Sequence, residues 1–159
     1  MAVRFPSLEF FRALQERMRA EHNRFRQLGY FDTTFGVRVR DHHAPAGHRD
    51  FVLSFEVFEC VGVRACDDVT QEPVDFIFDG DLSAWVEMLE NIKQNGAADL
   101  AHSINTLTHF GEGLRLIYDD PDGHDKLYRF AESVQQFFDL STQLDIEFGA
   151  AETSERPGV

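Results

Sequence analysis

The sequence lacks the features that define several classes of protein. It contains only two cysteines, Cys60 and Cys66, without CxxC spacing or neighbouring metal ligands. Two such thiols do not make a disulfide framework and are typical of the reducing cytosol, so we expect a cytoplasmic protein. No stretch approaches the roughly 18 uninterrupted apolar residues of a transmembrane helix, and no apolar signal segment follows the N-terminus.

Basic residues are also scarce. Lys and Arg total 15 against 28 Asp and Glu, which gives a formal net charge of -13. This field repels polyanions, so we expect no nucleic-acid partner. Residues 1–28 are the exception, with six arginines and three glutamates. They fit a solvated helix face, and they leave open a protein-interaction module that uses the Arg-rich first helix.

Phenylalanine, in contrast, is abundant: there are 16 Phe but only three Tyr and one Trp. Because Phe has no polar group, this excess indicates dry surface, either core or a lined apolar cavity. A chain of 159 residues points to one domain that buries roughly two-thirds of its unfolded surface. We expect a single domain over residues 1–148 and a disordered tail over 149–159.

The hydrophobic periodicity alternates between that of helices and that of strands. Ser7 is a candidate cap for a first helix that Gly29 ends, and Asp81 is a candidate cap for a second that Gly96 ends. Gly62 marks either a bulge in one long strand or a turn into a further strand. The pattern predicts helices at 7–28, 82–95, from 97 and at 124–140, strands at 31–40, 51–57, 60–66, 74–79 and 114–118, and a loop at 41–50.

This order of elements predicts the α+β class. We expect an antiparallel-rich mixed sheet of about five strands, covered by helices, with an N-terminal helix and a long C-terminal helix. The strict βαβ alternation of nucleotide-binding folds is not present.

Motifs for metal or cofactor chemistry are weak. His42, His43 and His48 share a loop with Asp41 and Asp50, but adjacent histidines point apart in an extended chain, so a solvated loop is the default. The Gly111-Glu112-Gly113 segment lacks the further glycines and the Lys of a phosphate-binding loop. We therefore expect no metal and no cofactor.

One carboxylate pair keeps an enzyme open as an alternative. Asp75 and Asp79 lie on one strand face with Ile77 between them. A carboxyl group pressed against apolar rings can act as a general base, which would suit a small cone-shaped isomerase or cyclase with Asp75 in its pocket. A solvated strand face explains the same pattern.

The apolar side chains on the predicted inner faces are the main candidate site. Core packing accounts for them, but a ligand cavity uses the same residue types, and composition leaves both open. They are Phe35, Phe55, Phe76 and Phe78 on strands, and Trp85, Leu89, Leu107, Phe130, Val134 and Phe138 on helices.

A resemblance favours the cavity. Residues 74–89, Val-Asp-Phe-Ile-Phe-Asp-Gly-Asp-Leu-Ser-Ala-Trp-Val-Glu-Met-Leu, resemble the strand-then-helix segment of sterol carrier protein type 2 domains, and residues 114–118 look like the last strand of that family. The resemblance implies a sheet covered by helices around an apolar tunnel for sterols or acyl chains, without catalysis. We therefore expect a non-catalytic carrier of an apolar small molecule, lined by the ten residues above, with a homodimer left open. The turn at 119–125 and the long helix after it depart from the family pattern.

Overall fold

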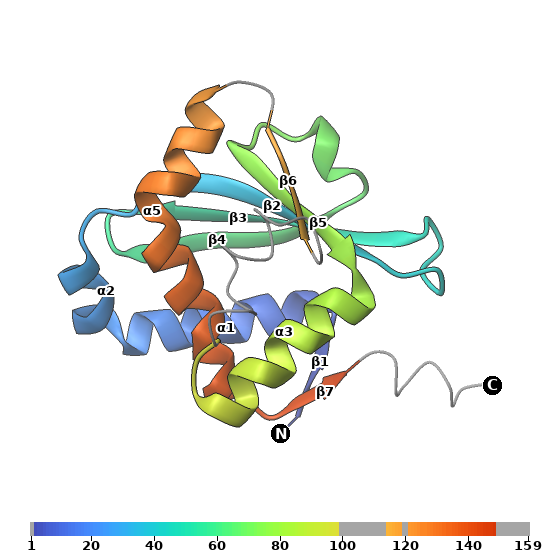
Figure 1. Ribbon diagram of the computed structural model, residues 1–159, viewed down its shortest axis with the longest axis horizontal. Coiled ribbons are helices and arrows are strands. Elements are labelled where there is room, and N and C mark those ends of the chain that lie inside the picture. The colour runs from blue at the N-terminus through green and yellow to red at the C-terminus, as the bar shows by residue number, and fades with distance from the viewer. Residues whose placement is uncertain (1, 99–113, 119–120, 149–159) are drawn as a thin grey trace.

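A five-stranded mixed sheet forms the centre of the protein (Figure 1). The computed structural model describes residues 2–98, 114–118 and 121–148. The strand order is β4-β3-β2-β5-β6, in which β2 and β5 run parallel and the other neighbours antiparallel. The predicted α+β class and five-stranded sheet are confirmed. The strands are β2 (Thr33–Arg40), β3 (His48–Glu56), β4 (Glu59–Cys66), β5 (Phe76–Asp81) and β6 (Leu114–Ile117).

Period-two alternation gives the sheet two different faces. Along β2, Phe35, Val37 and Val39 are buried on the helix-covered face, whereas Arg38 and Arg40 lie on the other. The strand register aligns the inward-facing residues of neighbouring strands: Phe35 pairs with Leu53 of β3 and with Phe76 of β5. The inner face is therefore apolar and the outer face carries the charges.

Helices cover the inner face (Figure 1). α1 contributes Phe10, Phe11, Leu14 and Met18, all fully buried, to the same hydrophobic cluster as the strands. No helix in the described part of the chain is long and apolar enough to span a bilayer. The helices are α1 (Leu8–Ala20), α2 (His22–Leu28), α3 (Leu82–Asn95) and α5 (Pro121–Asp139).

The predicted first helix is two helices. Ser7 is its N-cap as expected, accepting a hydrogen bond from the Phe10 N–H at 3.1 Å. The prediction of one continuous helix over 7–28 is wrong, because Glu21 departs from helical geometry with φ -102° and ψ 30°. α1 packs along β4, whereas α2 turns toward α5, where Arg24 Nε donates to Gln136 Oε1 at 2.6 Å.

The strand before α3 is shifted from its predicted bounds, since β5 covers Phe76–Asp81 rather than residues 74–79. We expected Gly80 to end it, but Gly80 lies within β5, paired with Val39 on one side and Leu114 on the other. A buried glycine between two partner strands still completes both ladders. Asp81 is the N-cap residue of α3, although its side chain makes no capping bond, and Gly96 ends the helix at φ 82°.

Several other boundaries differ from expectation; for example, β2 begins at Thr33 rather than at 31. The 51–66 region is a hairpin that turns at residues 57–58, with a register shift beside Ser54 and Phe55. The loop at 41–50 is shorter than predicted, because β3 already begins at His48. The last helix begins at Pro121 rather than at 124, since Pro suits the first turn of a helix.

A second, two-stranded sheet joins the two ends of the described chain. β1 (Val3–Phe5) pairs in parallel with β7 (Ile146–Phe148). Both strands are three residues long, too short for a detectable alternation, and neither was predicted. The predicted helix from 97 falls mainly outside the described residues, as does the predicted tail over 149–159.

Candidate functional site

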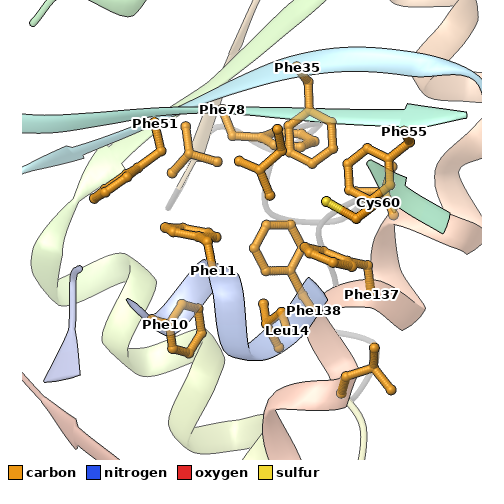
Figure 2. Close-up of a cluster of buried hydrophobic side chains, with 14 of the residues drawn as sticks. Phe10, Phe11, Leu14, Phe35, Phe51, Phe55, Cys60, Phe78, Phe137 and Phe138 are labelled. Atoms are coloured by element: carbon orange, nitrogen blue, oxygen red, sulfur yellow. The ribbon is translucent and has the colours of Figure 1, made fainter. Parts of the chain in front are cut away.

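A row of phenylalanines lies across the inner face of the sheet (Figure 2). The Phe35 ring stacks between Phe55 and Phe76, with centroids 5.4 and 5.3 Å apart and planes within 8° and 7° of parallel. Phe78 meets Phe35 edge-on at 5.4 Å. Alternation on β2, β3 and β5 and the strand register explain this arrangement, because each ring comes from an inward position.

The helix layer presents a matching set of rings. Phe138 of α5 contacts both Trp85 of α3, at 5.7 Å between centroids, and Phe35 of the sheet, at 6.4 Å. Phe130 contacts Phe31 at 5.6 Å. The expected packing of the Phe130, Val134 and Phe138 stripe against the sheet is thereby confirmed, with exposed fractions of 8, 0 and 1%.

Nine of the ten predicted ligand-lining residues therefore meet in one buried cluster, and Leu107 lies outside the described residues. The predicted ligand-lining set omitted Phe137 of the same helical stripe, whose ring meets Phe55 edge-on at 5.0 Å. Its position three residues after Val134 was a usable signal. The set also omitted Phe5 on the unpredicted β1, which contacts Trp85 at 6.5 Å.

The rings pack tightly against one another. Phe31 and Phe55 are stacked with centroids 4.4 Å apart, and Phe35, Trp85 and Phe78 have no exposed surface. These spacings are those of a close-packed protein interior. A ligand among the rings would therefore have to displace side chains rather than fill a ready space.

A hollow of about 780 Å³ lies at one end of this interior, between the loop after β2 and the first turns of α3. Leu82 and Val86 line it, and their other sides pack against the buried cluster. This volume lies within the range of small-molecule sites. The hollow contains none of the ten predicted residues, and its remaining lining is Arg40, Asp41, His42, His43, Gly47, Asp81, Ser83, Glu87 and Glu90.

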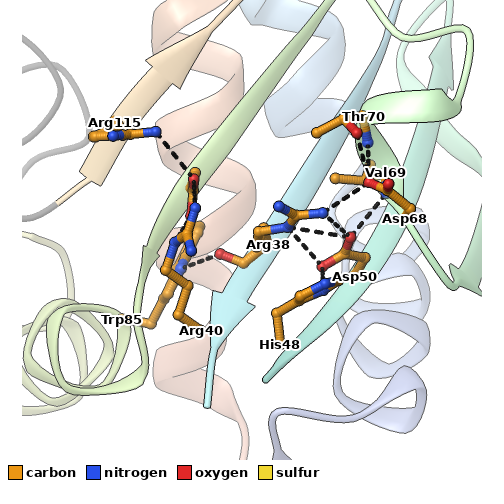
Figure 3. A network of polar contacts seen from close by, with 10 residues as sticks. Arg38, Arg40, His48, Asp50, Asp68, Val69, Thr70, Trp85 and Arg115 are labelled. Carbon is orange, nitrogen blue, oxygen red and sulfur yellow. Dashed lines mark hydrogen bonds and ion pairs between the residues drawn. The ribbon is translucent and has the colours of Figure 1, made fainter. Parts of the chain in front are cut away.

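The outer face of the sheet carries a network of ion pairs (Figure 3). Arg38 donates from Nε and Nη2 to Asp50, which also accepts from the Val69 N–H at 2.8 Å and lies 2.7 Å from His48 Nδ1. The bond to Asp50 raises the pKa of Arg38 despite its burial. Because Asp50 is fully buried and surrounded by donors, it is a structural carboxylate rather than a free base.

Asp79 is engaged in a similar way. Arg40 donates to both of its carboxylate oxygens, at 2.8 and 2.7 Å, and Arg115 lies 3.5 Å away. Its side chain is only 1% exposed. Asp79 and Asp75 therefore have separate cationic partners and do not share a site.

Asp75, the base of the enzyme alternative, is held by three donors. Its Oδ2 accepts from Thr33 Oγ1 at 2.7 Å, from the Thr34 N–H at 3.1 Å and from Lys126 Nζ at 3.2 Å. Burial alone would raise the pKa of Asp75, but these donors outweigh it and lower the pKa below its usual value. The hollow beside Asp75 holds about 50 Å³, too little for a substrate.

The thiols and histidines form no reactive centre among the described residues. Burial raises the pKa of Cys60 to about 12 and that of Cys66 to about 11, so both free thiols stay protonated and weakly nucleophilic. His42 and His43 lie against each other, with ring centroids 4.3 Å apart, whereas His48 turns to Asp50. Within the described residues, no three His, Cys, Asp or Glu side chains are placed to hold a metal ion.

Taken together, the fold and this interior define an α+β domain in which a Phe-lined sheet is covered by aromatic-bearing helices. No family model and no curated protein sequence matches the chain. Two solved structures match the chain in fold. A crystal structure of sterol carrier protein 2 matches with a TM-score of 0.65 and 19% identity, over 86% of this chain and 95% of that one.

The second is a solution structure of a conserved hypothetical protein from Thermus thermophilus, described as a candidate sterol carrier protein. It matches with a TM-score of 0.60 and 17% identity, over 89% of this chain and 90% of that one. The chain therefore has a sterol carrier protein-like fold.

Proposed function

We propose that this chain is a non-catalytic carrier that binds an apolar small molecule, a lipid, acyl chain or sterol-like compound, among the rings between sheet and helices. The observation that carries the proposal is the stacked row of Phe55, Phe35 and Phe76 facing Trp85 and Phe138, on a fold shared with sterol carrier protein 2. The ten lining residues are those of the sequence prediction, Phe35, Phe55, Phe76, Phe78, Trp85, Leu89, Leu107, Phe130, Val134 and Phe138.

The free energy of binding would come from removing the ligand from water, at about 25 cal/mol per Å² of apolar area. Part of it would be spent on separating rings that already contact one another. The 780 Å³ hollow is the proposed route, because Leu82 and Val86 separate it from the cluster. A ligand that displaces these two side chains reaches Trp85, which lies next to Val86 and one turn after Leu82 on α3.

An enzyme is less well supported. The lowered pKa of Asp75 makes it a poor base near neutral pH, and its carboxylate is bound by Thr33 and Lys126. An interaction module would have only the outer face of α1, which carries the exposed Arg12 and Arg19, because Phe10, Phe11 and Leu14 are buried in the core.

Trp85 provides the test, since it is the single tryptophan and lies within the proposed site. Native mass spectrometry first identifies any co-purified lipid, and ligand-free protein is then titrated with fatty acids and sterols while Trp85 emission is followed. We expect a saturable change in emission. No bound lipid together with a flat trace across these ligands, from folded protein, would refute the carrier.

Two matched variants locate the binding. Phe76→Leu changes the shape of the inner face without adding charge, and we expect it to weaken binding about tenfold. Phe58→Leu makes the same change at the β3–β4 turn, outside the buried cluster, and should bind as the wild type does. Phe55→Asp places an unpaired charge in the site and should abolish binding, with folding checked by circular dichroism.

A further inference from the structure

The hairpin between β3 and β4 turns on an unusual residue. Its two turn residues are Val57 and Phe58, and Val57 has φ 61°, in the left-handed region. Two-residue hairpins with positive φ at the first turn position normally place Gly there. A β-branched residue in this region is a strained outlier, which is retained only where the surroundings impose it.

A contact from outside the hairpin holds this conformation. The N–H of Phe31, just after α2, donates to the carbonyl oxygen of Val57 at 2.8 Å. Glu56 and Glu59 pair on either side of the turn. The linker after α2 thus holds the turn in place by this hydrogen bond. In this conformation the Val57 side chain is 43% exposed.

A second irregularity in the same hairpin exposes another valine. Ser54 faces Gly62 and Phe55 faces Cys60, so Val61 is an extra residue in β4. Bulges of this kind redirect a side chain. Val61 is 49% exposed, although strand valines normally lie on a dry face.

We give the name tip patch to four residues at and beside this turn: Tyr30, Val57, Phe58 and Val61. The Tyr30 and Phe58 rings meet edge-on with centroids 6.1 Å apart, and Tyr30 is 66% exposed. Figure 1 shows this end of the sheet beside α2. Two backbone irregularities therefore serve to present apolar side chains to solvent.

The size and charge of the patch determine what can cover it. Its exposed side-chain surface is on the order of 300 Å², well below the roughly 800 Å² per partner of a stable protein interface. A second copy would also bring another net charge of -13. Glu56 and Glu59 are exposed beside the patch and would repel an anionic surface. The nearby Arg19 already pairs with Glu16 and Glu59, so it offers such a surface little attraction.

An apolar tip with a tyrosine at its margin fits the interface of a lipid bilayer, where aromatic rings with one polar end are enriched. We propose that the tip patch docks the protein on a neutral, zwitterionic membrane surface, with Val57 and Phe58 inserted between the headgroups. This contact goes beyond the proposed carrier function, because it does not require a ligand in the interior.

The test is sedimentation of ligand-free protein with phosphatidylcholine vesicles, comparing the wild type with the Val57→Asn/Phe58→Ser double variant. Asn tolerates the left-handed region, so the change at Val57 should not destabilise the turn, and circular dichroism checks that the double variant, which also loses the Tyr30–Phe58 ring contact, is folded. We expect its partitioning onto vesicles to fall at least about tenfold. Tyr118→Ser, which removes an aromatic 44% exposed outside the tip patch, should leave binding within about twofold.

Three results would overturn the proposal. The first is that the wild type does not bind the vesicles, and the second is that the wild type and the double variant bind equally. The third is that binding requires phosphatidylserine and disappears as salt is raised from about 50 to about 500 mM. The last result would assign docking to the arginines of α1 instead. Retained binding to neutral vesicles at high salt, with its loss in the double variant, supports the tip patch.

Discussion

The indole nitrogen of Trp85 donates a hydrogen bond to the backbone carbonyl oxygen of Arg38 at 3.1 Å. This bond joins α3 to the central strand β2 across the edge of the aromatic interior (Figure 3). Arg38 in turn binds Asp50 on the outer face, so one backbone position connects the dry interior with the outer ion pairs. The aromatic interior and the ion pairs of the outer face therefore both depend on the position of β2.

The first prediction concerns this bond. Trp85→Phe keeps an aromatic ring in the cluster but removes the donor and part of the volume, so we expect the free energy of unfolding to fall by about 1–3 kcal/mol. Urea unfolding followed by circular dichroism measures it, since the variant has no tryptophan. An unchanged midpoint would show that neither the bond nor the lost volume contributes to stability.

The second prediction concerns Asp75. Asp75→Asn removes the charge that accepts from Thr33 and pairs with Lys126, so stability at pH 7 should fall by about 1–2 kcal/mol. Because the folded pKa of Asp75 is lowered, its contribution is present above the unfolded value near 3.9 and is lost as pH falls through the folded value. The wild type and variant should thus converge in acid.

The same variant separates the carrier from the enzyme. Binding of apolar ligands should stay nearly intact in Asp75→Asn, because the residue lies outside the buried aromatic cluster. Thr33→Val serves as the control that removes a single hydrogen bond from the carboxylate. If the protein turns over a substrate and Asp75→Asn removes most of that rate, the isomerase or cyclase alternative is correct.

The third prediction concerns Asp139 at the end of α5. Burial raises the pKa of Asp139, against the hydrogen bonds from Gln135 Nε2 and the Ala98 N–H. The folded protein therefore binds this proton more tightly than the unfolded chain does. The contribution of Asp139 to stability is largest below its unfolded pKa and falls as pH rises through its folded pKa.

Asp139→Asn keeps a side-chain oxygen that can accept from Ala98 and avoids the buried charge. We expect stabilisation at pH 7 of about 1 kcal/mol, or about 2–4 °C in Tm, and no gain near pH 4. Asp67→Asn, at an exposed position, is the control and should show neither effect. A loss of stability of Asp139→Asn at pH 7 would contradict the inference that the buried charge of Asp139 destabilises the folded protein.

The fourth prediction concerns a close approach between α5 and the residue just before β5. A Cβ on Gly123 would meet the backbone carbonyl oxygen of Asp75, an atom that no rotamer change can move. Gly123→Ala gains about 1 kcal/mol of helix propensity, but this clash should outweigh it and leave a net loss of about 1–3 kcal/mol. Gly62→Ala, whose Cβ meets nothing within 4 Å, should change Tm little.

Alternation and helical spacing identified the inner face correctly. Phe35, Phe76 and Phe78 were placed from period two alone, and Phe130, Val134 and Phe138 from the helical stripe. These patterns are local consequences of burying one face of each element, so they are readable without contacts. The strand–helix segment 74–89 also indicated the fold that the chain shares with sterol carrier protein 2.

Other features depended on partners far away in sequence. β1 exists because Val3 and Phe5 find Ile146 and Phe148 beside them, and no three-residue pattern encodes that pairing. The break at Glu21 has neither Gly nor Pro, and it arises where α1 on β4 gives way to α2 against α5. Boundaries of this kind are set by packing.

The sequence by itself determined the dry face, the acidic exterior and the α+β class, because hydrophobic periodicity and charge are properties of the chain. Only the tertiary structure decided how closely the Phe35, Phe55 and Phe76 rings stack, which carboxylates are paired, and that Val57 stands exposed at φ 61°. Each depends on atoms brought together from separate strands and helices, and Val57 is held by an N–H from residue 31. Long-range contacts fix such details, and they are made only when the chain has folded.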